Sequence, residues 1–290
     1  MKKSKLVLIY FIFIGFALHA QTVNIPDTNF LKAIIKNGVD KNGDGLIQLD
    51  EAKLVDSLNV SQDSIKNLKG IEAFSSLAKL DCYFNLLNEI DISKNTSLTY
   101  LCCFGNKLKT IDISQNKKLK FLFCYTNQLS SINVSHNLKL EVLDIHNNQI
   151  SFLEISKNKK LTKISCFSNQ LKNIDLKQNK KLEYLFCYSN QFTSIDFSGN
   201  LKLRVLDCHS NNISSLDFSK NLALEELDCA GNILKNLHLS ANLALKELDS
   251  AENPDLREIC LDKSHLEIIK NDSENWEKDE FVKWVIDCKN

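Results

Sequence analysis

Apolar residues recur along most of this chain with a spacing of 21 residues and without a single insertion. Each unit opens on a leucine, and the opening leucines are Leu77, Leu98, Leu119, Leu140, Leu161, Leu182, Leu203, Leu224 and Leu245. With that leucine as position 1, positions 1, 4, 6, 11, 14 and 16 are apolar, as in Leu98, Leu101, Cys103, Leu108, Ile111 and Ile113. The alternation at positions 4 and 6 predicts a short strand whose apolar side chains point inward.

A unit of this length cannot bury its own apolar face, so neighbouring units must stack. Stacking aligns the strands into one parallel sheet along one side of the molecule. The second half of each unit has no room for a long helix, so extended or turn structure is expected on the convex side. Together with the pattern L-x-x-L-x-C-x-x-N-x-L, the period predicts an α/β leucine-rich repeat solenoid, mostly β, with a parallel concave sheet.

Asparagine occupies position 9 in every unit, from Asn85 to Asn253, and position 19 from Asn95 to Asn242. A turn buries backbone N–H and C=O groups that need partners. A buried amide offers both donors and an acceptor, so it can bridge its own turn and the next. These asparagines are predicted to be scaffold rather than binding residues.

Cysteine fills position 6 in most units, at Cys82, Cys103, Cys124, Cys166, Cys187, Cys208 and Cys229. Ile145 stands there in the remaining full unit, so the site requires an apolar side chain, and free cysteine behaves as one. Neighbouring strands lie roughly 4.8 Å apart, so distance alone does not exclude disulfides. Parallel side-chain directions in a tight core favour thiols.

Residues 1–20 have the pattern of a secretory signal peptide. Lys2, Lys3 and Lys5 form a basic start, an apolar core follows, and Ala20 offers a small residue at the cleavage site. A retained anchor is the alternative. The mature chain, from Gln21, is then expected to have no transmembrane segment and to be secreted or at the cell surface, with the periplasm as a further location.

Residues 21–53 are predicted to form a helical cap with a calcium loop. A helix that begins near Asp27 leads into residues 40–51, whose spacing matches the motif D-x-[DN]-x-[DN]-G…E. A hard cation needs six or seven oxygens. The predicted ligands of one structural Ca²⁺ are Asp40, Asn42, Asp44, the Leu46 carbonyl, Gln48 and Glu51. An ion-free loop that serves only as a capping turn is the alternative.

The repeats are predicted to span residues 54–253, with an irregular first unit before Leu77, and residues 254–290 to form a C-terminal cap. Ile259 and Leu261 are expected to form a last strand. Cys260 and Cys288 lie outside the cysteine ladder and are the candidate disulfide of an exported protein. Three aromatic residues are expected to cover the final turn: Trp276, Phe281 and Trp284.

The repeats resemble those of secreted bacterial leucine-rich repeat proteins of the internalin-like kind. The resemblance implies an N-terminal cap with an EF-hand-like element and a C-terminal cap in which two cysteines bracket a tryptophan. It also implies protein recognition through the concave face. The chain departs from that family in showing no LPxTG-like anchor and no Ig-like module after the repeats.

Positions 3, 5 and 7 point out of the predicted sheet and line its concave face. They carry many aromatic residues, and a contiguous exposed aromatic patch marks an interaction surface. The predicted ligand-binding residues are Tyr100, Phe121, Phe123, Tyr125, Phe167, Tyr184, Phe186 and Tyr188. Rings that only stack on one another and cover the sheet are the alternative. Towards the C-terminus the same face becomes acidic, with Asp207, Glu226, Asp228, Glu247 and Asp249.

Composition removes several classes of function. Lys plus Arg and Asp plus Glu both number 36, so no basic surplus points to nucleic acid. No metal-ligand histidine pair, phosphate loop or nucleophile elbow is present, so the chain is not expected to be an enzyme. The sequence favours a protein-binding module. A glycan-binding module and a structural envelope protein without a dedicated ligand are the alternatives.

Overall fold

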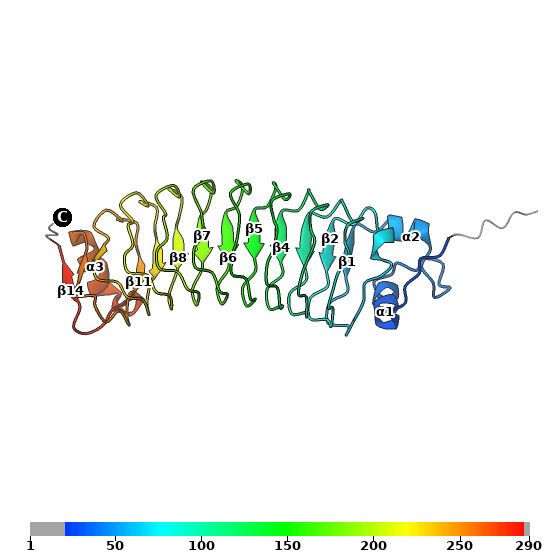
Figure 1. The fold of residues 1–290 in the computed structure, drawn as a ribbon, viewed down its shortest axis with the longest axis horizontal. Helices are drawn as coiled ribbons and strands as arrows, with labels where there is room; N and C mark the ends of the chain where they lie inside the picture. Colours follow the sequence, from blue (N-terminus) through cyan, green and yellow to red (C-terminus); the bar gives the residue numbers. More distant parts are fainter. Residues whose placement is uncertain (1–20, 287–290) are drawn as a thin grey trace, which may run out of the picture.

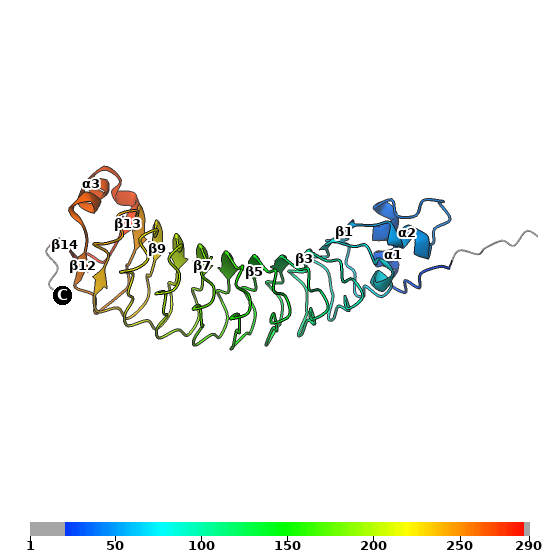
Figure 2. The same cartoon turned by 90° about the horizontal axis from the view of Figure 1, so that it is seen from above.

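The chain forms an elongated, curved solenoid, with one helical cap at each end (Figure 1). The computed structural model describes residues 21–286. Seen from above, the short strands lie side by side along the concave edge, and the loops of the second half of each unit fan out on the convex side (Figure 2).

One parallel sheet runs through the whole molecule, in the order β1-β2-β3-β4-β5-β6-β7-β8-β9-β11-β13. Partner residues within the repeats are 21 positions apart, as for Leu80 and Leu101. The predicted leucine-rich repeat solenoid is therefore confirmed. The strands are β1 (Ser57–Asn59), β2 (Lys79–Asp81), β3 (Tyr100–Cys102), β4 (Phe121–Phe123), β5 (Val142–Asp144), β6 (Lys163–Ser165), β7 (Tyr184–Phe186), β8 (Val205–Asp207), β9 (Glu226–Asp228), β11 (Glu247–Asp249) and β13 (Trp276–Glu277).

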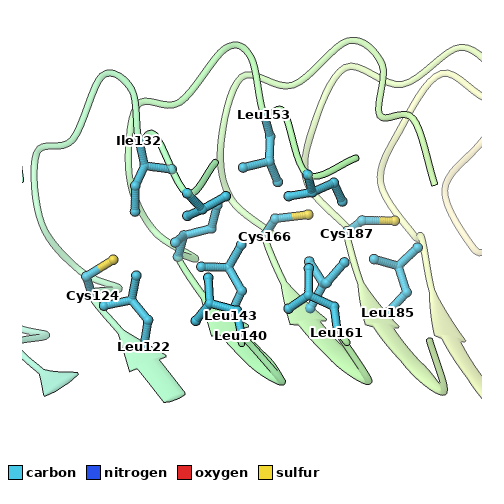
Figure 3. Packing of buried hydrophobic residues seen from close by; sticks show 14 of the residues in the cluster. Leu122, Cys124, Ile132, Leu140, Leu143, Leu153, Leu161, Cys166, Leu185 and Cys187 are labelled. Atoms are coloured by element: carbon cyan, nitrogen blue, oxygen red, sulfur yellow. The ribbon is translucent and has the colours of Figure 1, made fainter. Parts of the chain in front are cut away.

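The core is a set of columns, in which equivalent side chains of successive units lie one above the other. Leu122, Leu143 and Leu185 from position 4 are fully buried, and the cysteine sulfurs of Cys124, Cys166 and Cys187 point into the same interior (Figure 3). All seven position-6 cysteines are buried free thiols. Burial raises the pKa of Cys166 to about 12, so such thiols are protonated and act as small apolar groups.

Each position-9 asparagine joins the backbone of its own unit to that of the preceding unit. Asn169, for example, donates from Nδ2 to the carbonyl oxygens of Ile145 (3.0 Å) and Cys166 (3.1 Å), and its Oδ1 accepts from the N–H of Ile150 (2.9 Å). The amide therefore satisfies buried backbone groups of its own unit and of the preceding one. These contacts agree with a scaffold role.

The position-19 asparagines form a second ladder near the start of each strand. Asn158 donates to the carbonyl oxygens of Val134 (2.9 Å) and Asn137 (2.9 Å), and Asn137 is itself the preceding member of the ladder. The Oδ1 atoms of all eight members, from Asn95 to Asn242, have no hydrogen-bond partner. The side chains of this ladder therefore form hydrogen bonds only through their Nδ2 donors.

Each turn after a strand needs a left-handed residue at position 8. Positive φ angles between 49° and 64° occur there in all nine units: Phe84, Gly105, Thr126, Asn147, Ser168, Ser189, Ser210, Gly231 and Glu252. Only glycine, and to a lesser degree asparagine, adopts this region readily. The repeat geometry therefore overrides local preference at most of these positions.

The N-terminal cap consists of α1 (Thr28–Lys36), the loop that follows it, and α2 (Leu49–Lys53). Asp27 joins this cap to the first unit, where η1 (Ile71–Ala73) precedes the regular repeats. Its Oδ1 accepts from two N–H groups of α1, and its Oδ2 accepts from the N–H groups of Lys66 (2.8 Å) and Asn67 (3.0 Å). Burial alone would raise the pKa of Asp27, but these four hydrogen bonds lower it below its usual value.

The C-terminal cap differs from the prediction. Ile259 lies in β12 (Glu258–Cys260), which belongs to a second sheet with β10 (Leu237–His238) and β14 (Lys283–Val285). The last strand of the concave sheet is instead β13, which the chain reaches through an unpredicted helix, α3 (Lys263–Asn271), and a short turn, η2 (Ser273–Asn275). Trp276 is buried and covers the final turn, whereas Phe281 is half exposed.

Candidate functional site

The predicted aromatic residues all lie on the concave face, and all are partly exposed. The structure divides them into two groups with different surroundings. Those at position 7 belong to a continuous row, and those at positions 3 and 5 form two separate clusters. The difference matters because the rings of the clusters are tilted against one another or flanked by cations instead of being stacked face to face.

The position-7 row is a stack of seven rings, one per turn, in the order Tyr83, Phe104, Tyr125, His146, Phe167, Tyr188 and His209. Adjacent centroids are 4.1–4.7 Å apart and adjacent planes are within 14° of parallel. Each inner ring therefore has both faces covered, and only its edge is open. Tyr125, Phe167 and Tyr188 can therefore offer only their ring edges to a ligand.

The first cluster lies on β3 and β4. Tyr100 is 5.5 Å from Phe123 and 6.4 Å from Phe121, with tilted ring planes in both pairs. Cys102 lies below them, only 4% exposed, and its burial raises the pKa of its thiol to about 11. This thiol is therefore protonated at neutral pH.

The second cluster lies on β7 and carries positive charge at its edges. Lys163 Nζ is 5.2 Å from the centre of the Phe186 ring, and the Arg204 guanidinium donates to the Tyr184 hydroxyl (3.0 Å). Arg204 also donates to Glu225 (2.7 Å), which lowers the pKa of that carboxyl to about 2. Val142 on β5 and Lys163 on β6 separate the two clusters along the sheet.

Beyond β7 the concave face becomes an acidic hollow of about 300 Å³, closed at its far end by the C-terminal cap. In Figure 2 this cap rises above the end of the sheet on the concave side. Burial raises the pKa of both Asp207 and Asp228. The carboxylates that line the hollow are Asp207, Glu226, Asp228, Glu247, Asp249, Glu274 and Glu277.

Five of the six predicted calcium ligands lie in the loop between α1 and α2, and Glu51 lies on α2 itself; backbone N–H groups orient the carboxylates of Asp40 and Glu51. Asp40 accepts from the N–H groups of Gly43 (2.7 Å) and Gly45 (2.9 Å), and Glu51 accepts from those of Lys41 (2.7 Å) and Gln48 (2.9 Å). Gly43 and Gly45 both have positive φ, which the sharp turn requires.

Three of the side chains already touch. Asn42 Nδ2 donates to Asp44 Oδ2 (3.1 Å) and Gln48 Oε1 (3.2 Å), and Gln48 Nε2 donates to Asp44 Oδ2 (2.8 Å). The Leu46 carbonyl lies on the same exposed loop. This all-oxygen donor set fits a hard cation. The carboxylates of Asp40, Asp44 and Glu51 are not gathered within 4.8 Å of one another, so ion binding would have to draw them together.

The predicted disulfide falls partly outside the described residues. Cys260 is buried in β12 and is disulfide-bonded. Its predicted partner, Cys288, lies outside the described range, so the pairing stays a prediction. Within residues 21–286, no helix is long and apolar enough to span a membrane.

Comparisons with known proteins agree on the architecture. No protein-family model matches the chain, and no curated protein sequence matches it. Among solved structures, the functional domain of InlJ from Listeria monocytogenes, described as including a cysteine ladder, is 28% identical, with a TM-score of 0.62. That alignment covers 92% of this chain and 70% of InlJ. The fold is that of leucine-rich repeat proteins.

Two further solved structures share this fold at lower identity. The internalin InlF of L. monocytogenes is 18% identical, with a TM-score of 0.68, over 95% of this chain and 99% of its own. The leucine-rich repeat protein LIC12759 of Leptospira interrogans is 22% identical, with a TM-score of 0.69, over 80% of this chain and 62% of its own. The chain is thus similar to internalin-like proteins in its architecture, and InlJ adds similarity in the cysteine ladder.

Proposed function

We propose that this chain is an exported recognition protein that binds a protein partner through the concave face of its sheet. The observation that carries the proposal is the pair of aromatic clusters at positions 3 and 5, centred on Phe123 and Phe186. Their rings are partly exposed at the middle of a concave surface. Exposed aromatic groups of this kind form the centres of protein interfaces.

The flanking charges support a polar rim around these clusters. Lys163 and Arg204 lie beside the second cluster, and the acidic hollow follows directly. A partner would therefore meet apolar, basic and acidic surface in sequence along the groove. Such an order can fix the orientation of a bound protein. The same proposal includes export of the chain, directed by residues 1–20. It also holds that the chain binds its partner without catalysing a reaction.

Glycan binding receives less support from the geometry. Sugar rings stack on open aromatic faces, but the faces of the inner position-7 rings are covered by their neighbours at 4.1–4.2 Å. The rings at positions 3 and 5 are not stacked in this way, but cations lie over three of them, Tyr100, Tyr184 and Phe186. The longest aromatic feature of the concave side is therefore unsuited to sugars.

A capture experiment tests the proposal. The purified chain and a Phe123→Ala/Phe186→Ala variant are probed against panels of purified cell-surface protein ectodomains and polysaccharides. We expect the wild type to retain a protein that the variant does not. Truncation of an interface aromatic costs about 2–4 kcal/mol, so the double variant should lose at least 30-fold in affinity.

The matched control is Phe152→Ala, which removes an exposed phenylalanine outside the strands (62% exposed). It should bind as the wild type does. Retention of polysaccharide instead of protein would establish the glycan alternative. Equal binding by the wild type and the double variant would exclude the aromatic clusters as the binding site.

We also propose that residues 40–51 bind one structural Ca²⁺. Extracellular sites of this kind have a Kd of about 10⁻⁴–10⁻³ M. A tenfold excess of Ca²⁺ over Kd should then raise the free energy of unfolding by about 1.4 kcal/mol. The measurement is urea unfolding with and without Ca²⁺.

Asp40→Asn should abolish this response, whereas Asp50→Asn should retain it because Asp50 lies on α2 outside the predicted ligand set. A wild-type unfolding curve that does not respond to Ca²⁺ would show that the loop is only a capping turn.

A further inference from the structure

The stacked row of rings ends at a histidine that lies between two carboxylates. His209 Nδ1 is 2.7 Å from Asp207 Oδ1 and 3.2 Å from Asp228 Oδ2. Among the described residues, these three form the one group whose His, Cys, Asp or Glu ligand atoms all lie within 4.8 Å of one another. The group stands at the edge of the acidic hollow, where Asp207 on β8 is in register with Phe186 on β7.

The fold fixes the position of each member. Asp207 on β8 and Asp228 on β9 are in register, so their side chains leave the sheet side by side. Asp228 Oδ1 accepts from the N–H of Ala230 (3.1 Å), which leaves Oδ2 free to face the imidazole. The ring of His209 stacks on Tyr188 at 4.2 Å. The three ligand atoms are thus held in place by backbone and ring contacts.

A second Asp–His pair in the same chain serves as an internal comparison. Asp144 and His146 occupy the same repeat positions three turns earlier, and their Oδ1 and Nδ1 atoms are 2.6 Å apart. The residue in register with Asp144 on the next strand is Ser165, so no third ligand is present. One aspartate is therefore sufficient to orient a position-7 histidine, and Asp228 needs a different explanation.

Electrostatic repulsion between neighbouring aspartates supplies an explanation for Asp228. Asp207, Asp228 and Asp249 stand in register on three adjacent strands. Like charges directly opposite each other destabilise a sheet. A bound cation would offset this cost.

We propose that Asp207, His209 and Asp228 bind a divalent transition metal, with Zn²⁺ as the ion that matches best. Imidazole nitrogen and carboxylate oxygen are both Zn²⁺ ligands. Bonds of about 2.0–2.2 Å in a tetrahedral site place ligand atoms roughly 3.3–3.5 Å apart, close to the 3.2 Å between His209 Nδ1 and Asp228 Oδ2. Asp207 Oδ1, at 2.7 Å from His209 Nδ1, would move away by about 0.6 Å on metal binding. The fourth position would face the hollow and be open to solvent or to a partner's side chain. Binding of Zn²⁺ here does not require the proposed partner.

Calorimetric titration of the purified chain with ZnCl₂ tests the site, in excess Ca²⁺ so that residues 40–51 do not compete. We expect one saturable binding event in the wild type. His209→Phe and Asp228→Ser should each abolish it. Both substitutions copy residues that the repeats already accept at these positions, Phe104 or Phe167 and Ser165, so the fold is preserved.

The control His146→Phe removes the other Asp–His pair and should leave the event unchanged. Co²⁺ should in turn give visible absorption bands that are lost in His209→Phe. A wild-type titration indistinguishable from that of His209→Phe would overturn the proposal. His209 would then be a proton-carrying bridge between two carboxylates.

Discussion

Replacement of Asn169 by alanine should lower the free energy of unfolding by about 2–5 kcal/mol, because it leaves the buried N–H of Ile150 unpaired, at roughly 1–3 kcal/mol, and removes two further hydrogen bonds worth about 0.5–1.5 kcal/mol each. The carbonyls of Ile145 and Cys166 each lose one of two amide donors and keep the other, from Asn148 and Asn190. They lie in the middle of the solenoid, where water cannot readily replace the amide. Urea unfolding followed by far-UV circular dichroism measures the effect.

Two further variants make this result specific. Gln170→Ala removes the exposed neighbouring side chain and should stay within about 0.5 kcal/mol of the wild type. Asn158→Ala should cost less than Asn169→Ala, because Asn158 serves two backbone carbonyls and its Oδ1 has no partner. If Asn169→Ala costs no more than Gln170→Ala, the position-9 ladder does not hold the turns together.

The repeat period explains why so much of the fold could be predicted. A unit of 21 residues with fixed apolar positions has one way to bury its leucines, which is to stack on the next unit. Stacking then places Leu122 on Leu143 and Cys166 near Cys187, and it lines up the asparagines as well. Sequence position therefore translates directly into position in space.

The caps could not be predicted in the same way, because they lie outside the period. Leu266 still fits position 1 of a further unit, but Asn271 stands at the apolar position 6 and Glu274 replaces the position-9 asparagine, and the chain forms α3 there instead. Trp276 then takes the place of a position-4 leucine, in register with Leu248. That Trp276 occupies the place of a repeat leucine could be recognised only in the three-dimensional structure.

The candidate site was predictable in location but not in detail. The pattern placed all eight aromatic residues on the concave face, yet it did not separate stacked rings from open clusters. That separation depends on ring orientation, which sequence does not encode. The Asp207–His209–Asp228 group did have a sequence signal: an Asp–His pair at positions 5 and 7, followed by another Asp at position 5 of the next unit.

His265→Ala should destabilise the C-terminal cap by about 1–3 kcal/mol, because it leaves the N–H of Asp262 unpaired and removes one of two donors to the Asn242 carbonyl, which keeps the N–H of Leu245. His265 is fully buried. Its Nδ1 accepts from the N–H of Asp262 (3.1 Å), so Nε2 carries the proton and donates to the carbonyl of Asn242 (3.0 Å). Asn242 is the last member of the position-19 ladder, so His265 takes the place of the next asparagine.

Tryptophan fluorescence during urea unfolding isolates this effect, since both tryptophans of the chain, Trp276 and Trp284, lie in the C-terminal cap. In His265→Ala the fluorescence transition should move to lower urea and precede the loss of circular dichroism, because a solenoid without its cap unfolds from the exposed end.

His238→Ala, which removes an exposed histidine from β10, should leave both transitions in place. Coincident, unshifted transitions in His265→Ala would mean that the ladder ends at Asn242 without help from the cap. A fluorescence transition at lower urea would show that the His265 imidazole links the cap to the last repeat. Each position-19 asparagine makes the equivalent link to the unit before it.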